Sequence, residues 1–126
     1  MYEATVRRSF SAAHSLKEIG GKCEKLHGHN FVIEISVASS TLNREGLVID
    51  FRTVKNWADQ TLEELDHSCL NDVPVFHDKN PSAENIAHYI FRRMEEQAAT
   101  AGIHVSRVTV WESENAKVTY TGTDHA

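Results

Sequence analysis

Hydrophobic and polar residues alternate along the first segment of the chain, from residue 2 to residue 13. The apolar positions share one parity: Tyr2, Ala4, Val6, Phe10 and Ala12. A period of two is typical of a strand with one buried face, and Arg8 is the single residue that breaks the pattern. His14 continues the apolar parity, so we expect it on the buried face at the end of this strand.

A second alternating segment runs from His27 to about Ser40. One face of this predicted strand carries His27, His29, Phe31, Ile33, Ile35 and Val37. The intervening residues 15–26 contain two adjacent glycines and mixed charges, which predicts a loop that carries Cys23. Both predicted strands therefore end their apolar faces in histidine.

Two amphipathic segments predict helices. Asp50 is a plausible N-cap for the first, which should end near Asp66 and His67, and Asn80-Pro81-Ser82 is a start signal for the second. The apolar residues at helical spacing are Phe51, Val54, Ala58, Leu62 and Leu65 in the first, and Ile86, Ile90, Met94 and Ala98 in the second. Gly102 is well placed to end the second helix.

Two further strands are predicted at residues 105–112 and 117–122, joined by a turn at Glu114 and Asn115. The order β-β-α-α-β-β predicts an α+β fold, with a four-stranded antiparallel sheet and two helices on one of its faces. We expect one domain over residues 1–126. Such a sheet has two free edges, so we also expect a homo-oligomer that covers them.

The bulk composition narrows the class of protein. A net charge of −5 argues against a general nucleic-acid binder, which usually carries a basic excess. No apolar run approaches the length of about 18 residues that a membrane span requires, and the first residues lack a signal-peptide pattern. We therefore expect a cytoplasmic protein with neither a nucleic-acid nor a membrane partner.

The candidate chemistry begins with Cys23-x3-His27-Gly28-His29. On a strand, positions 27 and 29 face the same side with their Cβ atoms about 6.5–7 Å apart, which suits two imidazoles that bind one ion. If the first two strands pair as an antiparallel hairpin, His14 joins them. Three histidines leave one coordination position open, as in catalytic zinc sites, whereas a lone histidine at a strand end is ordinary surface. We expect a metal site at His14, His27 and His29, although imidazoles also suit iron, nickel or copper.

Two interpretations of Cys23 remain open from the residues alone. It could be a fourth ligand that closes a structural site, or a reactive thiol whose pKa is lowered by the metal and the neighbouring imidazoles. The spacing does not distinguish them.

Asp66-His67 and Glu112 are the other candidates. A carboxylate beside an imidazole can form an acid–base unit, although the same dipeptide at a helix end is often only a cap. Glu112 shares the parity of Val108 and Val110, so it would point inward, where it could accept hydrogen bonds from a ring with adjacent N–H donors, such as a pterin or guanine. The alternative for Glu112 is a residue at a strand end that faces water.

Taken together, these motifs resemble the 6-pyruvoyltetrahydropterin synthase family over nearly the whole chain. The matching stretches are Phe10-Ser-Ala-Ala-His14, Cys23-x3-His27-Gly-His29, Leu65-Asp66-His67, Pro81-Ser82-Ala83-Glu84-Asn85 and Trp111-Glu112. The resemblance implies the tunnelling fold, in which subunits join their sheets into trimeric barrels and two barrels stack into a hexamer. Active sites in this fold lie between subunits.

The spacing of three residues between Cys23 and His27 is similar to the branch of bacterial 6-carboxytetrahydropterin synthases of queuosine biosynthesis. That branch converts 7,8-dihydroneopterin triphosphate to 6-carboxytetrahydropterin, acetaldehyde and triphosphate. The alternatives are a relative that makes 6-pyruvoyltetrahydropterin and a non-catalytic zinc- or pterin-binding module.

The resemblance also assigns roles to individual residues. His14, His27 and His29 would bind Zn²⁺, and Cys23 would be the thiolate that abstracts a proton. His67, oriented by Asp66, would be the acid–base partner. Glu112 would anchor the pterin ring, with Trp111 on the opposite side of that strand.

Overall fold

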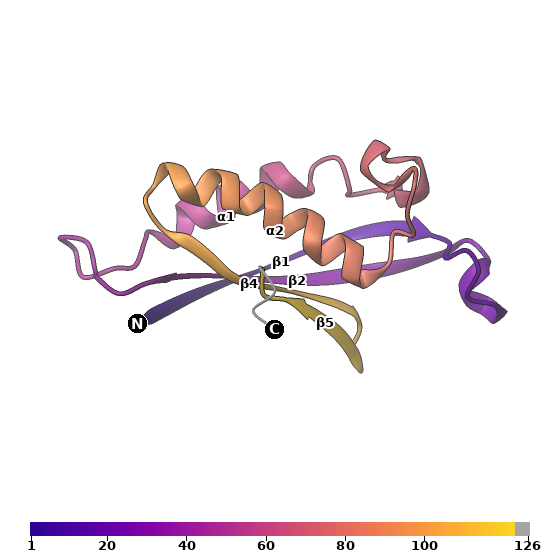
Figure 1. Cartoon of the computed structure of the whole chain (residues 1–126), viewed down its shortest axis with the longest axis horizontal. Coiled ribbons are helices and arrows are strands. Elements are labelled where there is room, and N and C mark those ends of the chain that lie inside the picture. Colours follow the sequence, from indigo (N-terminus) through magenta and orange to yellow (C-terminus); the bar gives the residue numbers. More distant parts are fainter. Residues whose placement is uncertain (123–126) are drawn as a thin grey trace.

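The computed structural model describes residues 1–122, so the last four residues of the expected domain lie outside the described part. Within residues 1–122 it contains two α-helices and a five-stranded sheet, and both helices cover one face of that sheet (Figure 1). The strands are β1 (Tyr2–His14), β2 (His27–Ser39), β3 (Ser68–Cys69), β4 (His104–Ser113) and β5 (Ala116–Tyr120). The helices are α1 (Phe51–Leu62) and α2 (Ala83–Thr100), with short 3-10 turns η1 (Gly21–Glu24), η2 (Leu70–Asp72) and η3 (Pro74–Phe76).

The sheet differs from the prediction in one respect. Its order is β3-β1-β2-β4-β5, and β3 pairs with β1 in parallel, at Ala12–Ser68 and Ala13–Cys69. The expected four-stranded antiparallel sheet is therefore wrong: the sheet is five-stranded and mixed. A strand of two residues is too short to show any alternation in the sequence, and its pairing joins residues 56 positions apart.

The hairpin of β1 and β2 is antiparallel as predicted, and its register places His14 directly opposite His27. The apolar parities of both strands face the helices. Phe31, Ile33 and Ile35 at the centre of β2 are completely buried there. The core thus fixes which face each strand turns inward, because a slip of one residue would move every apolar side chain to the other face.

The helix starts follow the predicted caps. The Asp50 carboxylate accepts a hydrogen bond from the Arg52 N–H, and the Ser82 hydroxyl accepts one from the Asn85 N–H. The end of the first helix differs: α1 stops at Leu62, and residues 63–67 form turns that reach Asp66 and His67. Leu65 is nevertheless fully buried and belongs to the hydrophobic core.

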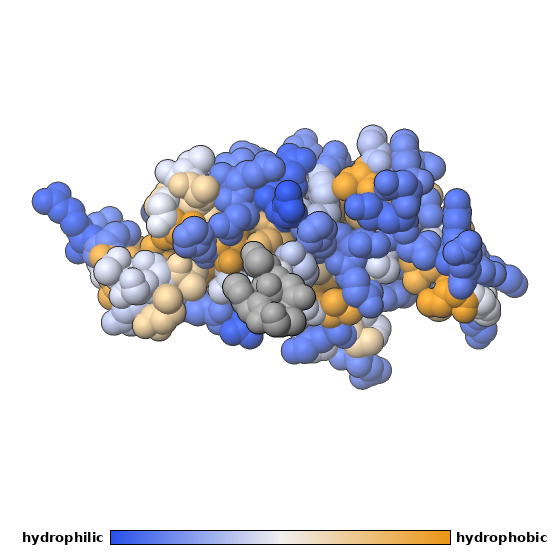
Figure 2. Space-filling model, viewed as in Figure 1, coloured by the Kyte–Doolittle hydropathy of each residue, from blue (hydrophilic) through white to orange (hydrophobic). Residues whose placement is uncertain are grey.

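The helix-free face of the sheet carries polar and charged pairs. Among them are Thr5 with Ser36, and Glu34 with the Trp111 indole N–H. Trp111 thus lies on the side opposite Glu112, as expected. The surface in Figure 2 is largely hydrophilic, with hydrophobic areas scattered over it. Among residues 1–122, no helix combines the length and the apolar character that crossing a membrane would need.

Candidate metal centre and active site

Three imidazoles converge at one end of the hairpin. The ring centroids of His14 and His27 lie 4.6 Å apart, those of His27 and His29 4.8 Å, and those of His14 and His29 5.1 Å. The cluster arises because the end of β1 meets the start of β2 in the antiparallel register. His14 is completely buried, whereas the other two rings are partly exposed. The structure therefore brings together the three histidines that the sequence singled out.

Backbone carbonyls orient two of these rings. The Nδ1 atom of His14 lies 2.7 Å from the carbonyl oxygen of Pro81, and Nδ1 of His27 lies 2.7 Å from that of Lys25. A carbonyl oxygen can only accept, so Nδ1 of each neutral ring carries the proton. The lone pair of each ring is then on Nε2. This is the tautomer that a metal-binding histidine adopts when a carbonyl holds its other nitrogen.

Glu112 belongs to the same cluster. One carboxylate oxygen lies 3.0 Å from Nε2 of His29 and 3.6 Å from Nε2 of His14. One donor atom from each histidine and one from Glu112 all lie within 4.8 Å of one another. The parity of Glu112 predicted that its side chain points inward. The sequence did not reveal that the carboxylate lies beside the imidazoles.

The buried nitrogens of the cluster fit a cation. Nε2 of His14 and Nε2 of His29 are buried without a hydrogen-bond partner among residues 1–122. A buried, unpartnered lone pair is costly, and a positive charge beside it removes that cost. Burial lowers the pKa of His29, which disfavours a proton on its ring, although the charge of Glu112 acts in the opposite direction. The donor set of three imidazoles and one carboxylate is one that zinc accepts.

Cys23 lies in η1, within the loop that joins β1 to β2. It is a free, exposed thiol, and the backbone carbonyl of Cys23 accepts a hydrogen bond from the Leu16 N–H at 2.8 Å. Within the part of the chain that the structure describes, the sulfur does not belong to the group of close donor atoms. This arrangement argues against the interpretation of Cys23 as a fourth metal ligand.

Asp66 and His67 are held against β1 rather than on a helix. The Asp66 carboxylate accepts the Ser11 backbone N–H at 2.9 Å, and the Ser11 carbonyl accepts the His67 N–H at 2.6 Å. His67 has a φ of +57°, a left-handed conformation that costs energy for a residue with a side chain. Its Nδ1 lies 3.0 Å from the Asp66 carboxylate. The Ser11 N–H is the main reason that the pKa of Asp66 is lowered, so this group is a carboxylate at neutral pH.

Two cavities flank the cluster. One, of about 410 Å³, is lined by Ser11, Gly28, His29, Asn30, His67 and Ser68 among others. The second, of about 630 Å³, is lined by His29, Trp111, Glu112 and their neighbours. His29 contributes to both, so one chain brings His67 and Glu112 to either side of the histidines.

Four residues near the site make contacts that residue type does not predict: Ser11, Asn71, Asn80 and Pro81. Ser11 and Pro81 form these hydrogen bonds through their own backbone groups. Asn71 and Asn80 form them through their side chains, with backbone groups of another segment. Such contacts leave no signature in residue type. Asn80 and Pro81 fell in the predicted start of a helix, and Ser11 fell in the matching stretch Phe10-Ser-Ala-Ala-His14, but no stretch indicated these contacts.

Comparison with known proteins supports the resemblance that the motifs indicated. Residues 3–123 match the sequence profile described as 6-pyruvoyl tetrahydropterin synthase. The chain belongs to this family. The 6-pyruvoyl tetrahydropterin synthase family also accounts for the structure: the synthase from Caenorhabditis elegans superposes with a TM-score of 0.83 at 29% identity, covering 98% of both chains. The α+β fold is confirmed.

Relatives within the 6-pyruvoyl tetrahydropterin synthase family carry different activities in their names. A 6-carboxy-5,6,7,8-tetrahydropterin synthase from Synechocystis sp. is 41% identical over 101 residues, which is 76% of this chain and 76% of that protein. A dihydroneopterin monophosphate aldolase from Pyrococcus furiosus is 36% identical over 106 residues, covering 84% of this chain and 85% of that protein. Membership of the family therefore leaves the reaction to be argued from the site.

Proposed function

We propose that this chain is a zinc-dependent 6-carboxy-5,6,7,8-tetrahydropterin synthase. It converts 7,8-dihydroneopterin triphosphate and water to 6-carboxytetrahydropterin, acetaldehyde and triphosphate, a step of queuosine biosynthesis. The observation that carries this proposal is the cluster of three imidazoles with two buried, unpartnered Nε2 atoms, close to a carboxylate. The relatives named for this reaction, with 41% identity in one case, support the choice within the family.

His14, His27 and His29 would hold the zinc ion through Nε2. When bound there, zinc would supply a Lewis acid that lowers the pKa of a substrate hydroxyl and polarises a carbonyl oxygen. The carbonyls of Pro81 and Lys25 fix the ring orientation of two ligands, so little reorganisation is needed on binding. Glu112 remains available for the organic substrate in this assignment.

Two groups would move protons on the substrate side chain. Cys23, as a thiolate, would take a proton from carbon, and its exposure leaves the sulfur accessible. His67 would donate or accept a proton at oxygen, with Asp66 stabilising the imidazolium form. Because active sites of this fold lie between subunits, the Cys23 and the His67 of one site need not belong to the same chain.

Glu112 would bind the pterin ring. A carboxylate can accept two parallel N–H bonds from an amino-pyrimidine edge, and such charge-assisted bonds fix both position and orientation. The cavity of about 630 Å³ beside Glu112 and Trp111 has room for a bicyclic ring.

We also propose a homohexamer built as two trimers. Within residues 1–122, β1 pairs with β3 only at Ala12 and Ala13, which leaves most of its outer edge open, and β5 forms the opposite edge. Joining these edges between subunits would satisfy their backbone groups. Analytical ultracentrifugation gives the mass directly: a monomer at micromolar concentration would contradict this proposal.

Product analysis tests the reaction. Purified, zinc-loaded protein is incubated with 7,8-dihydroneopterin triphosphate, and acetaldehyde, triphosphate and pterins are quantified together. We expect acetaldehyde and triphosphate in equal amounts. Triphosphate without acetaldehyde would indicate the 6-pyruvoyl product instead, and binding without turnover would indicate a non-catalytic module.

One further arm addresses the aldolase relative. Dihydroneopterin monophosphate is supplied in place of the triphosphate under the same conditions. Cleavage of the monophosphate with no turnover of the triphosphate would overturn the proposal in favour of an aldolase.

A further inference from the structure

The loop between β1 and β2 has almost no hydrophobic attachment to the rest of the molecule. Residues 17–26 are all exposed, and Leu16 is the only buried residue of residues 15–26. The loop carries Cys23, to which the proposed function assigns a proton transfer from carbon. Within one subunit, hydrogen bonds therefore hold this loop, because apolar burial does not.

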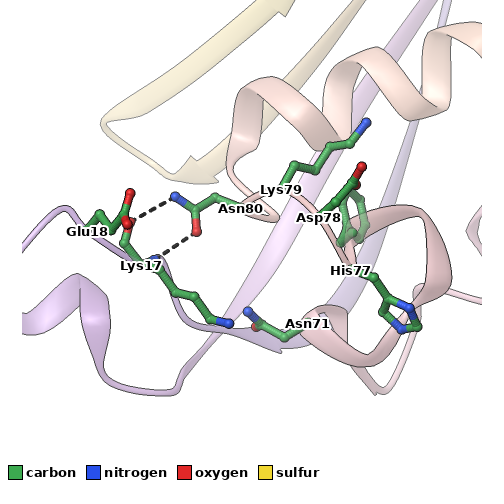
Figure 3. Close-up of a pocket in the computed structure, with 8 residues that line it drawn as sticks. Lys17, Glu18, Asn71, His77, Asp78, Lys79 and Asn80 are labelled. Atoms are coloured by element: carbon green, nitrogen blue, oxygen red, sulfur yellow. Dashed lines mark hydrogen bonds between the residues drawn. The ribbon is translucent and has the colours of Figure 1, made fainter.

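Two asparagine side chains supply these bonds to the start of the loop. The Asn71 amide accepts the Ser15 N–H at 2.9 Å and donates to the Ser15 carbonyl at 3.0 Å. The Asn80 amide does the same for Lys17, at 2.8 Å and 3.0 Å, as Figure 3 shows. Each amide thus satisfies both backbone groups of one residue, as a neighbouring strand would.

The backbone hydrogen bonds of residues 15–17 alternate between two sides, as they do along a strand with two edges. Residues i and i+2 point their backbone groups to one side and residue i+1 points to the other. Ser15 and Lys17 face the asparagines, whereas the Leu16 N–H points away and donates to the Cys23 carbonyl at 2.8 Å. Leu16 therefore connects Cys23, through a hydrogen bond, to the two residues that the asparagines hold.

The asparagines are themselves attached to rigid parts of the fold. Asn71 lies in η2 next to the fully buried Leu70. The carbonyl of Asn80 accepts the Asn85 side-chain N–H at 2.7 Å, and Asn85 lies in the first turn of α2. Pro81, the next residue, holds the His14 ring through its carbonyl. One short segment at the start of α2 thus fixes both a proposed zinc ligand and the loop of the proposed thiol.

We propose that Asn71 and Asn80 are positioning residues for Cys23, a role that rests on the proposed function of that thiol. They line a cavity of about 430 Å³ between the loop and the η3–α2 segment (Figure 3). Because the space beside them is open, no neighbouring side chain is packed where it could take over their hydrogen bonds. They order the loop by holding Ser15 and Lys17, and the Leu16–Cys23 hydrogen bond transmits that order to the thiol.

The test uses Asn71→Ala and Asn80→Ala in the full chain, with Asn43→Ala as the matched control. Asn43 also holds a loop through its side chain, by accepting the Glu45 and Leu47 N–H groups, but this loop lies between β2 and α1. Amide hydrogen exchange is measured by mass spectrometry over residues 15–26 and over the core strands. Zinc content, kcat and KM with dihydroneopterin triphosphate are measured in parallel.

We expect amide exchange in residues 15–26 to rise about 30-fold in Asn71→Ala and in Asn80→Ala, the amount that two lost hydrogen bonds of about 1 kcal/mol each imply. Exchange in the core and the zinc content should stay at wild-type values. The kcat should fall about tenfold with little change in KM, because the thiol acts in the chemical step and not in binding. Asn43→Ala should change none of these quantities.

Three results would overturn the inference: unchanged exchange in residues 15–26, an equal rise throughout the core, or a loosened loop with wild-type kcat. If the wild-type chain turns over no pterin, the proposed function fails, and the exchange data alone then decide whether the asparagines order the Cys23 loop. Local loosening over residues 21–24 would still support that ordering, and its absence would refute it.

Discussion

Nε2 of His29 lies 3.0 Å from a carboxylate oxygen of Glu112, although their contact lacks hydrogen-bond geometry. Two lone pairs at this distance repel unless a proton or a metal ion lies close to both. The relationship shows that the proposed zinc site and the proposed pterin site are contiguous. A substrate bound by Glu112 would therefore place its ring next to the ion.

Replacing Glu112 by Gln separates the two possible roles of this carboxylate. If Glu112 binds the pterin ring, the variant keeps its zinc, and KM for the substrate rises about 10- to 100-fold because a charge-assisted pair of hydrogen bonds is lost. Metal content by mass spectrometry and steady-state kinetics measure both effects. Loss of zinc on dialysis would instead make Glu112 a metal ligand. Glu96→Gln, on the exposed side of α2, is the control.

His14→Ala should abolish zinc binding and also weaken the fold. The ring is fully buried and its Nδ1 bonds the Pro81 carbonyl, so its removal leaves a cavity and an unsatisfied acceptor. We expect a loss of about 2–4 kcal/mol in the free energy of unfolding of the metal-free protein, measured with urea. The exposed His104, paired with Glu95, provides the comparison: His104→Ala should cost less than about 1 kcal/mol and keep the zinc.

Cys23→Ala should stop acetaldehyde release while the zinc stays bound. The thiol is exposed, and its sulfur lies outside the group of close donor atoms found among residues 1–122. Losing a general base of this kind lowers kcat by about 10²- to 10⁴-fold. Turnover and zinc content are measured on the same preparation. A variant that loses its metal would show that the sulfur is a ligand, and the proposed mechanism would then fail.

The histidine cluster could be predicted from the sequence because it follows from local rules. Alternation placed His14 and His29 on the apolar faces of their strands, and the antiparallel pairing of consecutive strands brought the end of one to the start of the next. The helix starts at Asp50 and Ser82 were equally predictable, since capping depends on residues within one turn.

The remaining features depend on contacts between segments far apart in the chain. The neighbourhood of Glu112 is set by the register of β4 on β2, which shifts at a bulge near Ser36 and Val37. β3 has two residues and no pattern of its own. Asn71 and Asn80 bond the backbone groups of Ser15 and Lys17, which are present whatever the side chains at positions 15 and 17. None of these contacts leaves a periodic or compositional signal.

Asp66→Asn should impair catalysis without disturbing the fold. An Asn side chain can still accept the Ser11 N–H, so the attachment of this turn to β1 persists. The variant lacks the negative charge that would stabilise a protonated His67. We expect kcat to fall about 10- to 100-fold and the midpoint of thermal unfolding to stay near the wild-type value. A wild-type kcat would show that the charge of Asp66 has no part in the mechanism.

Asp50 should make the stability of the chain depend on pH in the acidic range. Hydrogen bonds from the Arg52 side chain, and then from its backbone N–H, lower the pKa of this carboxyl from 3.8 to about 2. Because the folded pKa is depressed, the contribution is complete above the unfolded value of 3.8 and disappears as the pH falls through about 2.

Asp50→Asn keeps a side-chain acceptor at the start of α1 and lacks the charge, so it isolates this effect. The difference in urea midpoint between wild type and variant should shrink as the pH is lowered from about 4 to about 2, the interval between the unfolded and folded pKa values of Asp50. A difference that is constant over that interval would show that the charge of Asp50 does not stabilise the fold.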